Sequence, residues 1–205
     1  MKITCTSDLH GAQPNLPGGD LLIIAGDLTS NDSEVAWVDF LDWLEVQQYR
    51  KIVLIAGNHD NSLQGAFPFS WPANAEYLCD SGTEFEGLKI WGSPWSLWFD
   101  GINPHCTAFT GTEEDLDKKF KMIPEDTDIL ITHGPPYGIL DKARNIRHVG
   151  SKALAVRTMA HLKLFIFGHI HEGYGEHWLG DTHLINASHM NAEYDPVNPP
   201  ITFEI

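Results

Sequence analysis

The chain has 205 residues, of which 42% are hydrophobic, and a formal net charge of −15. This length and composition predict one folded domain over residues 1–205 and exclude a disordered chain. The charge argues against long nucleic acids as partners, because these are bound mainly through Lys and Arg. A small phosphate ester remains compatible with it, provided that bound cations supply local positive charge.

Targeting features are not evident in the sequence. It contains no run of 18 apolar residues, so no transmembrane helix is expected. Met1 leads directly into a strand-like segment, so no secretory signal is expected either. Three cysteines without metal-binding spacing predict reduced thiols and a cytoplasmic protein. The oligomeric state is left open.

The first third of the chain alternates apolar runs with a helical pattern. Strands are expected over residues 2–7, 20–25 and 52–56. A helix is expected from about residue 33 to residue 48, because apolar side chains recur there on one helical face. Asn31 and Glu34 have the spacing of a capping box at its start.

The remainder mixes short strands with two further helices. Strands are expected over residues 76–79, 83–91, 128–132, 164–167, 183–185 and 201–205. The first two of these are expected to form a hairpin turned at residues 80–82. Helices are expected over residues 113–122, capped by Thr112, and 151–161. The alternation of strands and helices favours an α/β fold with mixed sheets.

Five of the expected strands are followed by Asp, Asn or His. These residues are Asp8 and His10, Asp27, Asn58 and His59, His133, and His169 and His171. A solvated turn would explain any one of these strand ends, but five coincident ends favour a site, since open α/β sheets bind ligands at the carboxyl ends of their strands.

The donor types indicate a metal site. Residues two apart on an extended strand share a face, so Asp8 is expected to pair with His10, and His169 with His171. Nitrogen and oxygen donors without cysteine suit manganese, iron or zinc. The set is too large for one ion, whereas two divalent metal ions that share Asp27 would accommodate it. Such a pair of ions suits in-line phosphoryl displacement.

These residues carry a family resemblance. The motifs are Asp8-x-His10, Gly26-Asp27, Gly57-Asn58-His59-Asp60, His133-Gly134 and Gly168-His169-x-His171. In this order they resemble the five motifs of calcineurin-like metallophosphoesterases. The segments at residues 131–136 and 168–175 are similar to the small metallophosphoesterase-domain-containing proteins, a group associated with phosphodiester and cyclic-nucleotide hydrolysis.

The resemblance implies a fold and a set of roles. The fold would be a four-layer αββα sandwich, with two mixed central sheets flanked by helices. The first metal ion would be held by Asp8, His10, Asp27 and His171, and the second by Asp27, Asn58, His133 and His169. A metal-bridging hydroxide would be the nucleophile. His59 would protonate the leaving oxygen, and Asp60 would orient the His59 imidazole.

Weaker substrate-binding candidates lie near residue 150. Arg147 and His148 precede Ser151, where a helix N-terminus could receive an anion. The resemblance places substrate near this loop, and a solvated loop is an equal alternative.

Some aromatic and polar residues have open roles. Trp95 is expected in the core, whereas Trp98 and Phe99 could stack on a base or cover the core. Asn186 could form a turn or brace the site through a hydrogen bond.

The sequence therefore predicts a dinuclear-metal phosphodiesterase that acts on small phosphodiesters, with cyclic nucleotides among the candidates and manganese as the favoured metal. One alternative is a phosphomonoesterase or nuclease with the same site. The other is a nucleotide-binding protein with little turnover.

Overall fold

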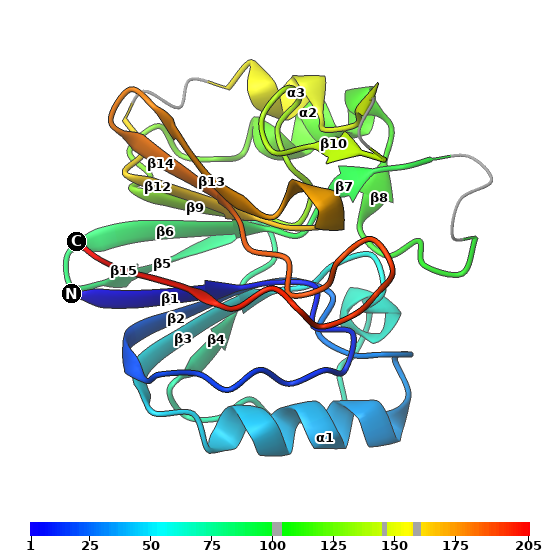
Figure 1. The fold of residues 1–205 in the computed structure, drawn as a ribbon, viewed down its shortest axis with the longest axis vertical. Coiled ribbons are helices and arrows are strands. Elements are labelled where there is room, and N and C mark those ends of the chain that lie inside the picture. Colours follow the sequence, from blue (N-terminus) through cyan, green and yellow to red (C-terminus); the bar gives the residue numbers. More distant parts are fainter. Residues whose placement is uncertain (100–103, 145–146, 158–160) are drawn as a thin grey trace.

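Two β-sheets face one another at the centre of the molecule, and helices lie on their outer sides (Figure 1). The computed structural model describes residues 1–99, 104–144, 147–157 and 161–205. Both sheets mix parallel and antiparallel pairs. The predicted mixed α/β class is therefore confirmed.

The first sheet has the strand order β15-β1-β2-β3-β4. Its strands are β1 (Lys2–Thr6), β2 (Gly19–Ala25), β3 (Tyr49–Ile55), β4 (Ala75–Tyr77) and β15 (Ile201–Glu204). The four N-terminal strands run parallel, and β15 closes the edge beside β1 in the antiparallel sense. The chain ends therefore lie side by side, and the N-terminal amino group donates to the Ile205 carbonyl.

The second sheet has the order β13-β14-β12-β9-β6-β5. Its strands are β5 (Ser81–Phe85), β6 (Leu88–Ser93), β9 (Ile129–Thr132), β12 (Leu164–Phe167), β13 (Gly175–Leu179) and β14 (Thr182–Asn186). Two small ribbons lie beyond it: β7 (Ser96–Leu97) with β8 (Thr110–Gly111), and β10 (Lys142–Ala143) with β11 (Arg147–His148).

The central strands are buried on both faces, as expected for parallel strands covered on two sides. In β2, Leu21, Ile23 and Ala25 face the other sheet and enter a core shared by both sheets. Leu22 and Ile24 alternate with them and enter a second core beneath the first sheet. A third core lies on the outer face of the second sheet.

Helix α1 (Glu34–Glu45) covers the outer face of the first sheet (Figure 1). It buries Trp37, Phe40 and Leu44, the helical face predicted from the sequence. Its N-cap is Ser33, whose hydroxyl accepts from the Ala36 amide. The predicted cap at Asn31 is wrong, because the Asn31 side-chain carbonyl accepts from the Ser33 amide in the turn before the helix.

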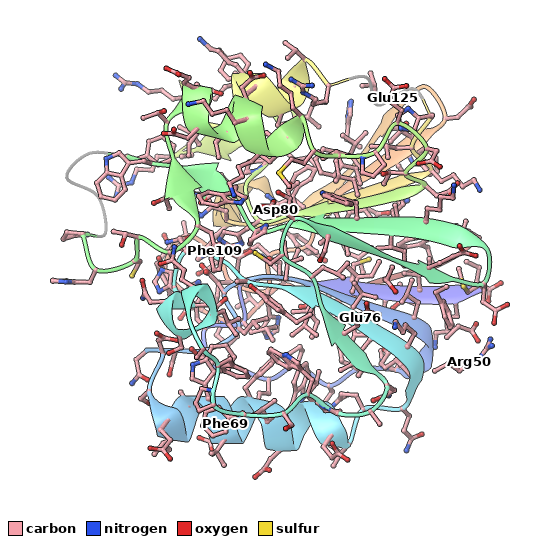
Figure 2. The ribbon with its side chains drawn as sticks, turned by 180° about the vertical axis from the view of Figure 1, so that it is seen from behind. Arg50, Phe69, Glu76, Asp80, Phe109 and Glu125 are labelled. Carbon is pink, nitrogen blue, oxygen red and sulfur yellow. The ribbon has the colours of Figure 1, made fainter. Side chains whose placement is uncertain are left out.

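Aromatic side chains fill the space between α1 and the first sheet. Phe67 and Trp71 stack with ring centroids 4.9 Å apart, and Trp71 stacks on Tyr77 of β4. Phe69 packs against the same core, close to α1 (Figure 2). The segment at residues 67–71 thus packs between α1 and the outer face of the first sheet.

Helices α2 (Glu113–Phe120) and α3 (Lys152–Ala155) cover the second sheet. Thr112 caps α2 in a capping box with Asp115, as predicted for Thr112. Helix α3 is shorter than the predicted helix over 151–161, part of which (residues 158–160) lies outside the described residues. None of the helices in the described ranges has the length and apolar character that a membrane crossing requires.

The predicted hairpin turn at residues 80–82 is wrong. β4 pairs with β3 in the first sheet, and the chain then crosses to the second sheet. The hairpin is formed by β5 and β6 around Glu86 and Gly87, which have φ of 51° and 77°. Two residues with positive φ suit the tight turn that matches strand twist, and glycine adopts this conformation readily.

Asp80 secures the crossing between the sheets. Its carboxylate accepts hydrogen bonds from the Ser93 hydroxyl, the Trp95 indole and the Lys119 ammonium. Ser93 belongs to β6 of the second sheet, Trp95 follows β6, and Lys119 belongs to α2. Trp95 is half-buried and packs against the second and third cores, which confirms its predicted place in the core, and Lys119 lies over its ring.

The two sheets leave no room for a side chain at Gly92. A Cβ at this position would lie 2.5 Å from the Leu78 Cβ and 2.7 Å from the Ile55 Cγ2. We expect Gly92→Ala to lower the free energy of unfolding by about 1–3 kcal/mol through overpacking. Gly65→Ala is the matched control, because a Cβ at Gly65 would have nothing within 4 Å. Equal midpoints in urea denaturation for both variants would contradict this packing.

Candidate metal centre and adjoining cavity

The predicted ligands come together where the carboxyl ends of strands from both sheets meet. The Asp8 amide donates to the Gly26 carbonyl, and the Gly168 amide donates to the His133 carbonyl. A direct link joins the two sheets: the His169 amide donates to both carboxylate oxygens of Asp8 at 3.0 Å. Residues 161 positions apart in the sequence are thereby fixed beside each other.

Neighbouring donor atoms have the separations expected of ligands on shared ions. His171 Nε2 lies 3.5 Å from Asp8 Oδ1, and His10 Nε2 lies 3.5 Å from Asp27 Oδ2. His133 Nε2 lies 3.4 Å from Asp27 Oδ2 and 3.0 Å from Asn58 Oδ1. Ligand bonds of about 2.0–2.2 Å place two donors on one ion at such distances.

Two observations support the fit of a cation. His10 Nε2 is buried and has no hydrogen-bond partner among the described residues, which is costly unless a ligand satisfies it. The side chains also form three overlapping groups of potential ligands: Asp8, His10 and His171; His10, Asp27 and His59; and Asp8, Asp27 and His133. The nitrogen and oxygen donor set suits manganese, iron or zinc.

The backbone reaches this arrangement by left-handed turns. Asp8, His10, Asp27 and His169 have φ of 51°, 43°, 52° and 68°. The expectation that Asp8 with His10, and His169 with His171, share a face on extended backbone is therefore wrong. Non-glycine residues with positive φ are uncommon and cluster at functional sites, where surrounding contacts hold them.

Two glycines allow the close approach of the chain segments. A Cβ at Gly57 would overlap the Asp27 carboxylate, and a Cβ at Gly168 would overlap Asp8 and the Ser7 hydroxyl. The glycines of the sequence motifs therefore have a steric function, since any side chain would displace a candidate ligand.

The histidines differ in proton affinity. Burial lowers the pKa of His10 to about 4, and burial together with the nearby His133 lowers the pKa of His169 to about 3. Burial also lowers the pKa of His133, but the Asp27 carboxylate outweighs it and raises that pKa to about 9. Although burial raises the pKa of Asp27, the charge and hydrogen bond of His133 hold it well below its usual value.

The structure corrects the expected role of Asp60. Its buried carboxylate accepts from the backbone amides of Leu28 and Gly57, and it does not bond to the His59 ring. Burial and the nearby Asp27 carboxylate raise its pKa well above the usual value. Asp60 therefore braces the turns that follow β2 and β3, and the expectation that it orients the imidazole is wrong.

Cys106, rather than Asp60, contacts the His59 imidazole. Its Sγ lies 3.4 Å from His59 Nδ1, and its carbonyl accepts from Asn58 Nδ2 at 3.2 Å. The His59 ring also packs edge-on against His10, with centroids 4.6 Å apart. His59 Nε2 is left facing Asp27 Oδ2 at 4.0 Å.

Several residues position the candidate ligands, and of these only Asn186 was considered from the sequence. Asn186 donates to the carbonyls of Leu140 and Ile170, and its side-chain oxygen accepts from the Ser188 amide two positions on, so it both braces the candidate ligand loop and forms a turn. His171 Nδ1 bonds to the Asn191 carbonyl at 3.0 Å. Tyr194 (φ 64°) packs edge-on against His171, with centroids 4.7 Å apart. Left-handed aromatic residues are infrequent enough to attract attention, but φ is not visible in a sequence.

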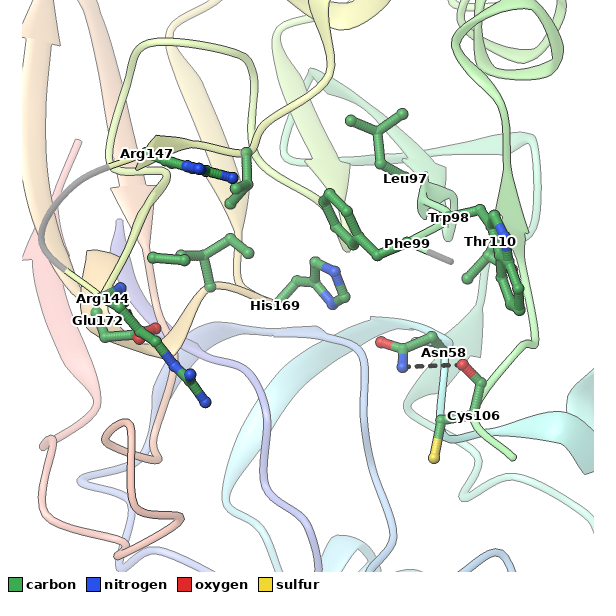
Figure 3. Close-up of a pocket in the computed structure, with 13 residues that line it drawn as sticks. Asn58, Leu97, Trp98, Phe99, Cys106, Thr110, Arg144, Arg147, His169 and Glu172 are labelled. Atoms are coloured by element: carbon green, nitrogen blue, oxygen red, sulfur yellow. Dashed lines mark hydrogen bonds between the residues drawn. The ribbon is translucent and has the colours of Figure 1, made fainter. Parts of the chain in front are cut away.

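A cavity of about 810 Å³ adjoins the candidate metal centre (Figure 3). Its lining residues are Asn58, Leu97, Trp98, Phe99, Cys106, Thr110, Ala143, Arg144, Arg147, Val149, His169, Ile170 and Glu172. Trp98 and Phe99, whose role the sequence left open, therefore face this cavity.

Of the two weaker candidates near residue 150, only Arg147 lines the cavity. His148 Nδ1 lies 2.5 Å from Asp141 Oδ1. The other Asp141 oxygen accepts from the amides of Gly138 and Gly150. Asp141 thus secures the base of the β10–β11 ribbon, and His148 is part of that structural contact.

Comparisons with known proteins agree with this geometry. Residues 1–173 match the family model described as calcineurin-like phosphoesterase. The chain is 35% identical to human metallophosphoesterase domain-containing protein 1 over 234 aligned residues, covering 100% of this chain and 71% of that protein. It is 26% identical to the 3',5'-cyclic adenosine monophosphate phosphodiesterase CpdA of Escherichia coli, covering 88% of this chain and 64% of that protein.

Solved structures show the same fold. TT1561 of Thermus thermophilus aligns with a TM-score of 0.62 and 16% identity, covering 90% of this chain and 88% of that one. Phosphopantetheinyl hydrolase PptH from Mycobacterium tuberculosis aligns with a TM-score of 0.57 and 14% identity, covering 98% and 95%. At these identities the likeness concerns the fold alone.

The fold, the donor set and the matched family together define a metal-dependent hydrolase of phosphate esters. The chain belongs to the calcineurin-like phosphoesterase family.

Cation binding should release protons. Histidine ligands must be neutral, and His133 carries a proton below its pKa of about 9, whereas His10 and His169 are already neutral at pH 7. We therefore expect Mn²⁺ affinity to rise from pH 6 to pH 8. Calorimetric titration in buffers of different ionisation enthalpy measures the released protons. Affinity that is independent of pH, with no proton release, would contradict the charge state assigned to His133.

Proposed function

We propose that the chain hydrolyses small phosphodiesters at a dinuclear centre of divalent cations, with manganese as the favoured metal. The observation that carries this proposal is the position of the cavity: Asn58 and His169, two candidate ligands, form part of its wall. A phosphoryl group at that wall would lie beside the candidate metal centre, while the cavity receives the ester groups.

The donor positions support a division into two cation sites. Asp8, His10 and His171 form one group, and we assign them to the first cation. Asn58, His133 and His169 are assigned to the second. Asp27 lies between the groups, within 3.5 Å of His10 and 3.4 Å of His133, so its carboxylate suits the shared position.

When bound, the two cations supply charge neutralisation and activation of a water nucleophile. His59 is proposed to protonate the leaving oxygen through Nε2, because that atom faces the centre while Nδ1 is engaged by Cys106. Asn58 is held by the Cys106 carbonyl, which directs its side-chain oxygen toward His133. Asp60 contributes indirectly by bracing the backbone of this turn.

The cavity supports small substrates. Its aromatic and aliphatic lining suits an apolar ester group or a nucleobase, and its arginines suit an anion. The E. coli relative is named as a cyclic AMP phosphodiesterase, which supports cyclic nucleotides as candidates. The charge of −15 opposes long nucleic acids.

The finer features of the fold and location are proposals as well. The three cores, with helices outside both sheets, support a four-layer αββα arrangement over residues 1–205 as one domain. The free thiols of Cys5, Cys79 and Cys106 support a reducing compartment such as the cytoplasm.

Reconstitution with metal tests the function directly. We expect metal-stripped protein to be inactive and Mn²⁺ to restore hydrolysis of bis(4-nitrophenyl) phosphate. The assay should include cyclic nucleotides and 4-nitrophenyl phosphate, with several divalent metals. A higher kcat/KM for 4-nitrophenyl phosphate than for the diesters would show that the protein is a phosphomonoesterase instead. Nucleotide binding without turnover of any ester would replace it with a binding protein.

Variants at adjacent positions should separate chemistry from cation binding. His59→Ala should lower kcat about 10²–10⁴-fold, the usual contribution of a proton donor, while two Mn²⁺ ions remain bound. Asn58→Ala should weaken one cation site, because it removes an oxygen donor. Metal content measured by mass spectrometry distinguishes the two effects. Loss of both cations in His59→Ala would show that His59 is a ligand instead.

A further inference from the structure

The cavity has two walls that are attached to different halves of the candidate metal centre. The first wall includes Trp98, Thr110 and Cys106. It docks on the turn after β3, because the Ala108 amide donates to the Asn58 carbonyl and the Cys106 carbonyl accepts from the Asn58 side-chain amide. We call this the aromatic wall. His59 lies on this side through its contact with Cys106.

The second wall is formed by the β10–β11 ribbon, which carries Arg144 and Arg147. It docks on the segment after β12, because the Arg144 amide donates to Glu172 Oε1 at 3.0 Å. Glu172 directly follows the candidate ligand His171. We call this the arginine wall. Figure 3 shows its two arginines on one side of His169, and Trp98, Thr110 and Cys106 on the other.

The arginine wall is positive in a strongly acidic chain. The chain has 13 Lys and Arg against 28 Asp and Glu, yet the charged cavity-lining residues are Arg144, Arg147 and Glu172. Two positive charges and one negative charge leave one positive charge there, and the Glu172 carboxylate is partly engaged by the Arg144 amide. Guanidinium groups recognise carboxylates and phosphates through paired hydrogen bonds.

We propose that the preferred substrate is an asymmetric phosphodiester with a flat apolar ester group on the aromatic wall and an anionic ester arm on the arginine wall. This inference rests on the proposed phosphodiesterase function. Because His59 lies on the aromatic side, the flat group is the one that leaves. Water adds to phosphorus and releases one proton, the phosphorus–oxygen bond to the flat group breaks, and His59 gives its proton to that oxygen. The proton released by water then restores His59. The products are a free alcohol and a phosphomonoester that keeps the anionic arm.

A matched pair of substrates tests the anionic arm. The first is 4-nitrophenyl 2-carboxyethyl phosphate, and the second is its carboxamide, which has the same shape without the charge. We expect Mn²⁺-loaded protein to show about tenfold higher kcat/KM for the carboxylate. The expected effect is modest because Arg144 and Arg147 are exposed, and exposed ion pairs contribute little. Equal kcat/KM values would overturn the proposal.

Variants assign the preference to each wall. Arg144→Gln and Arg147→Gln together should bring the carboxylate-to-carboxamide ratio close to one. Trp98→Ala should raise KM for both esters by about fivefold or more and leave the ratio intact, since stacking acts on the shared nitrophenyl group. Arg50→Gln is the control, because Arg50 pairs with Asp20 and Glu86 away from the cavity. An unchanged ratio in the double arginine variant would overturn the assignment.

A binding measurement separates this inference from the proposed function. If neither diester is hydrolysed, the phosphodiesterase proposal fails. Calorimetric titration of the same two compounds into Mn²⁺-loaded protein then tests the two walls independently. Tighter binding of the carboxylate, lost in the double arginine variant, would support the arginine wall, and equal binding would refute it.

Discussion

The burial of two carboxylates side by side is the constraint on which the site depends. Asp8 and Asp27 are almost completely removed from solvent at the ends of β1 and β2. Buried charges are costly unless they are paired, and a pair of like charges is more costly still. Backbone amides of His169 and His59 and the imidazole of His133 satisfy part of this demand. Divalent cations between these carboxylates and the histidines would neutralise the remaining charge. The buried carboxylates would then be stable only where cations can bind.

The same constraint explains the unusual backbone. Candidate ligands take left-handed φ values, and Gly57 and Gly168 lie too close to Asp27 and Asp8 to carry a side chain. Such conformations cost free energy and persist where surrounding contacts determine them. Here those contacts include the link from the His169 amide to Asp8, which joins the two sheets. The close packing of the sheets and the geometry of the candidate ligands are therefore parts of one arrangement, and the cavity walls extend from it.

Much of the fold could be predicted from the sequence, because continuous apolar runs specify buried strands and polar residues mark their ends. The predictions failed where distant contacts decide the outcome. Residues 80–82 look like a turn, but the chain crosses between the sheets before Ser81, and Ser81 and Gly82 begin β5. Asp60 follows His59 in sequence, yet the backbone amides of Leu28 and Gly57 take its carboxylate. Cys106 lies 47 positions from His59, so no local pattern could reveal their contact.

The proposed function requires two cations at the strand ends, with Asp27 shared between them. Anomalous diffraction from crystals grown with Mn²⁺ measures this most directly. Two cations that share Asp27 should give two peaks about 3.5–4 Å apart, one beside Asp8, His10 and His171 and the other beside Asn58 and His133. A single peak, or peaks away from the strand ends, would contradict it.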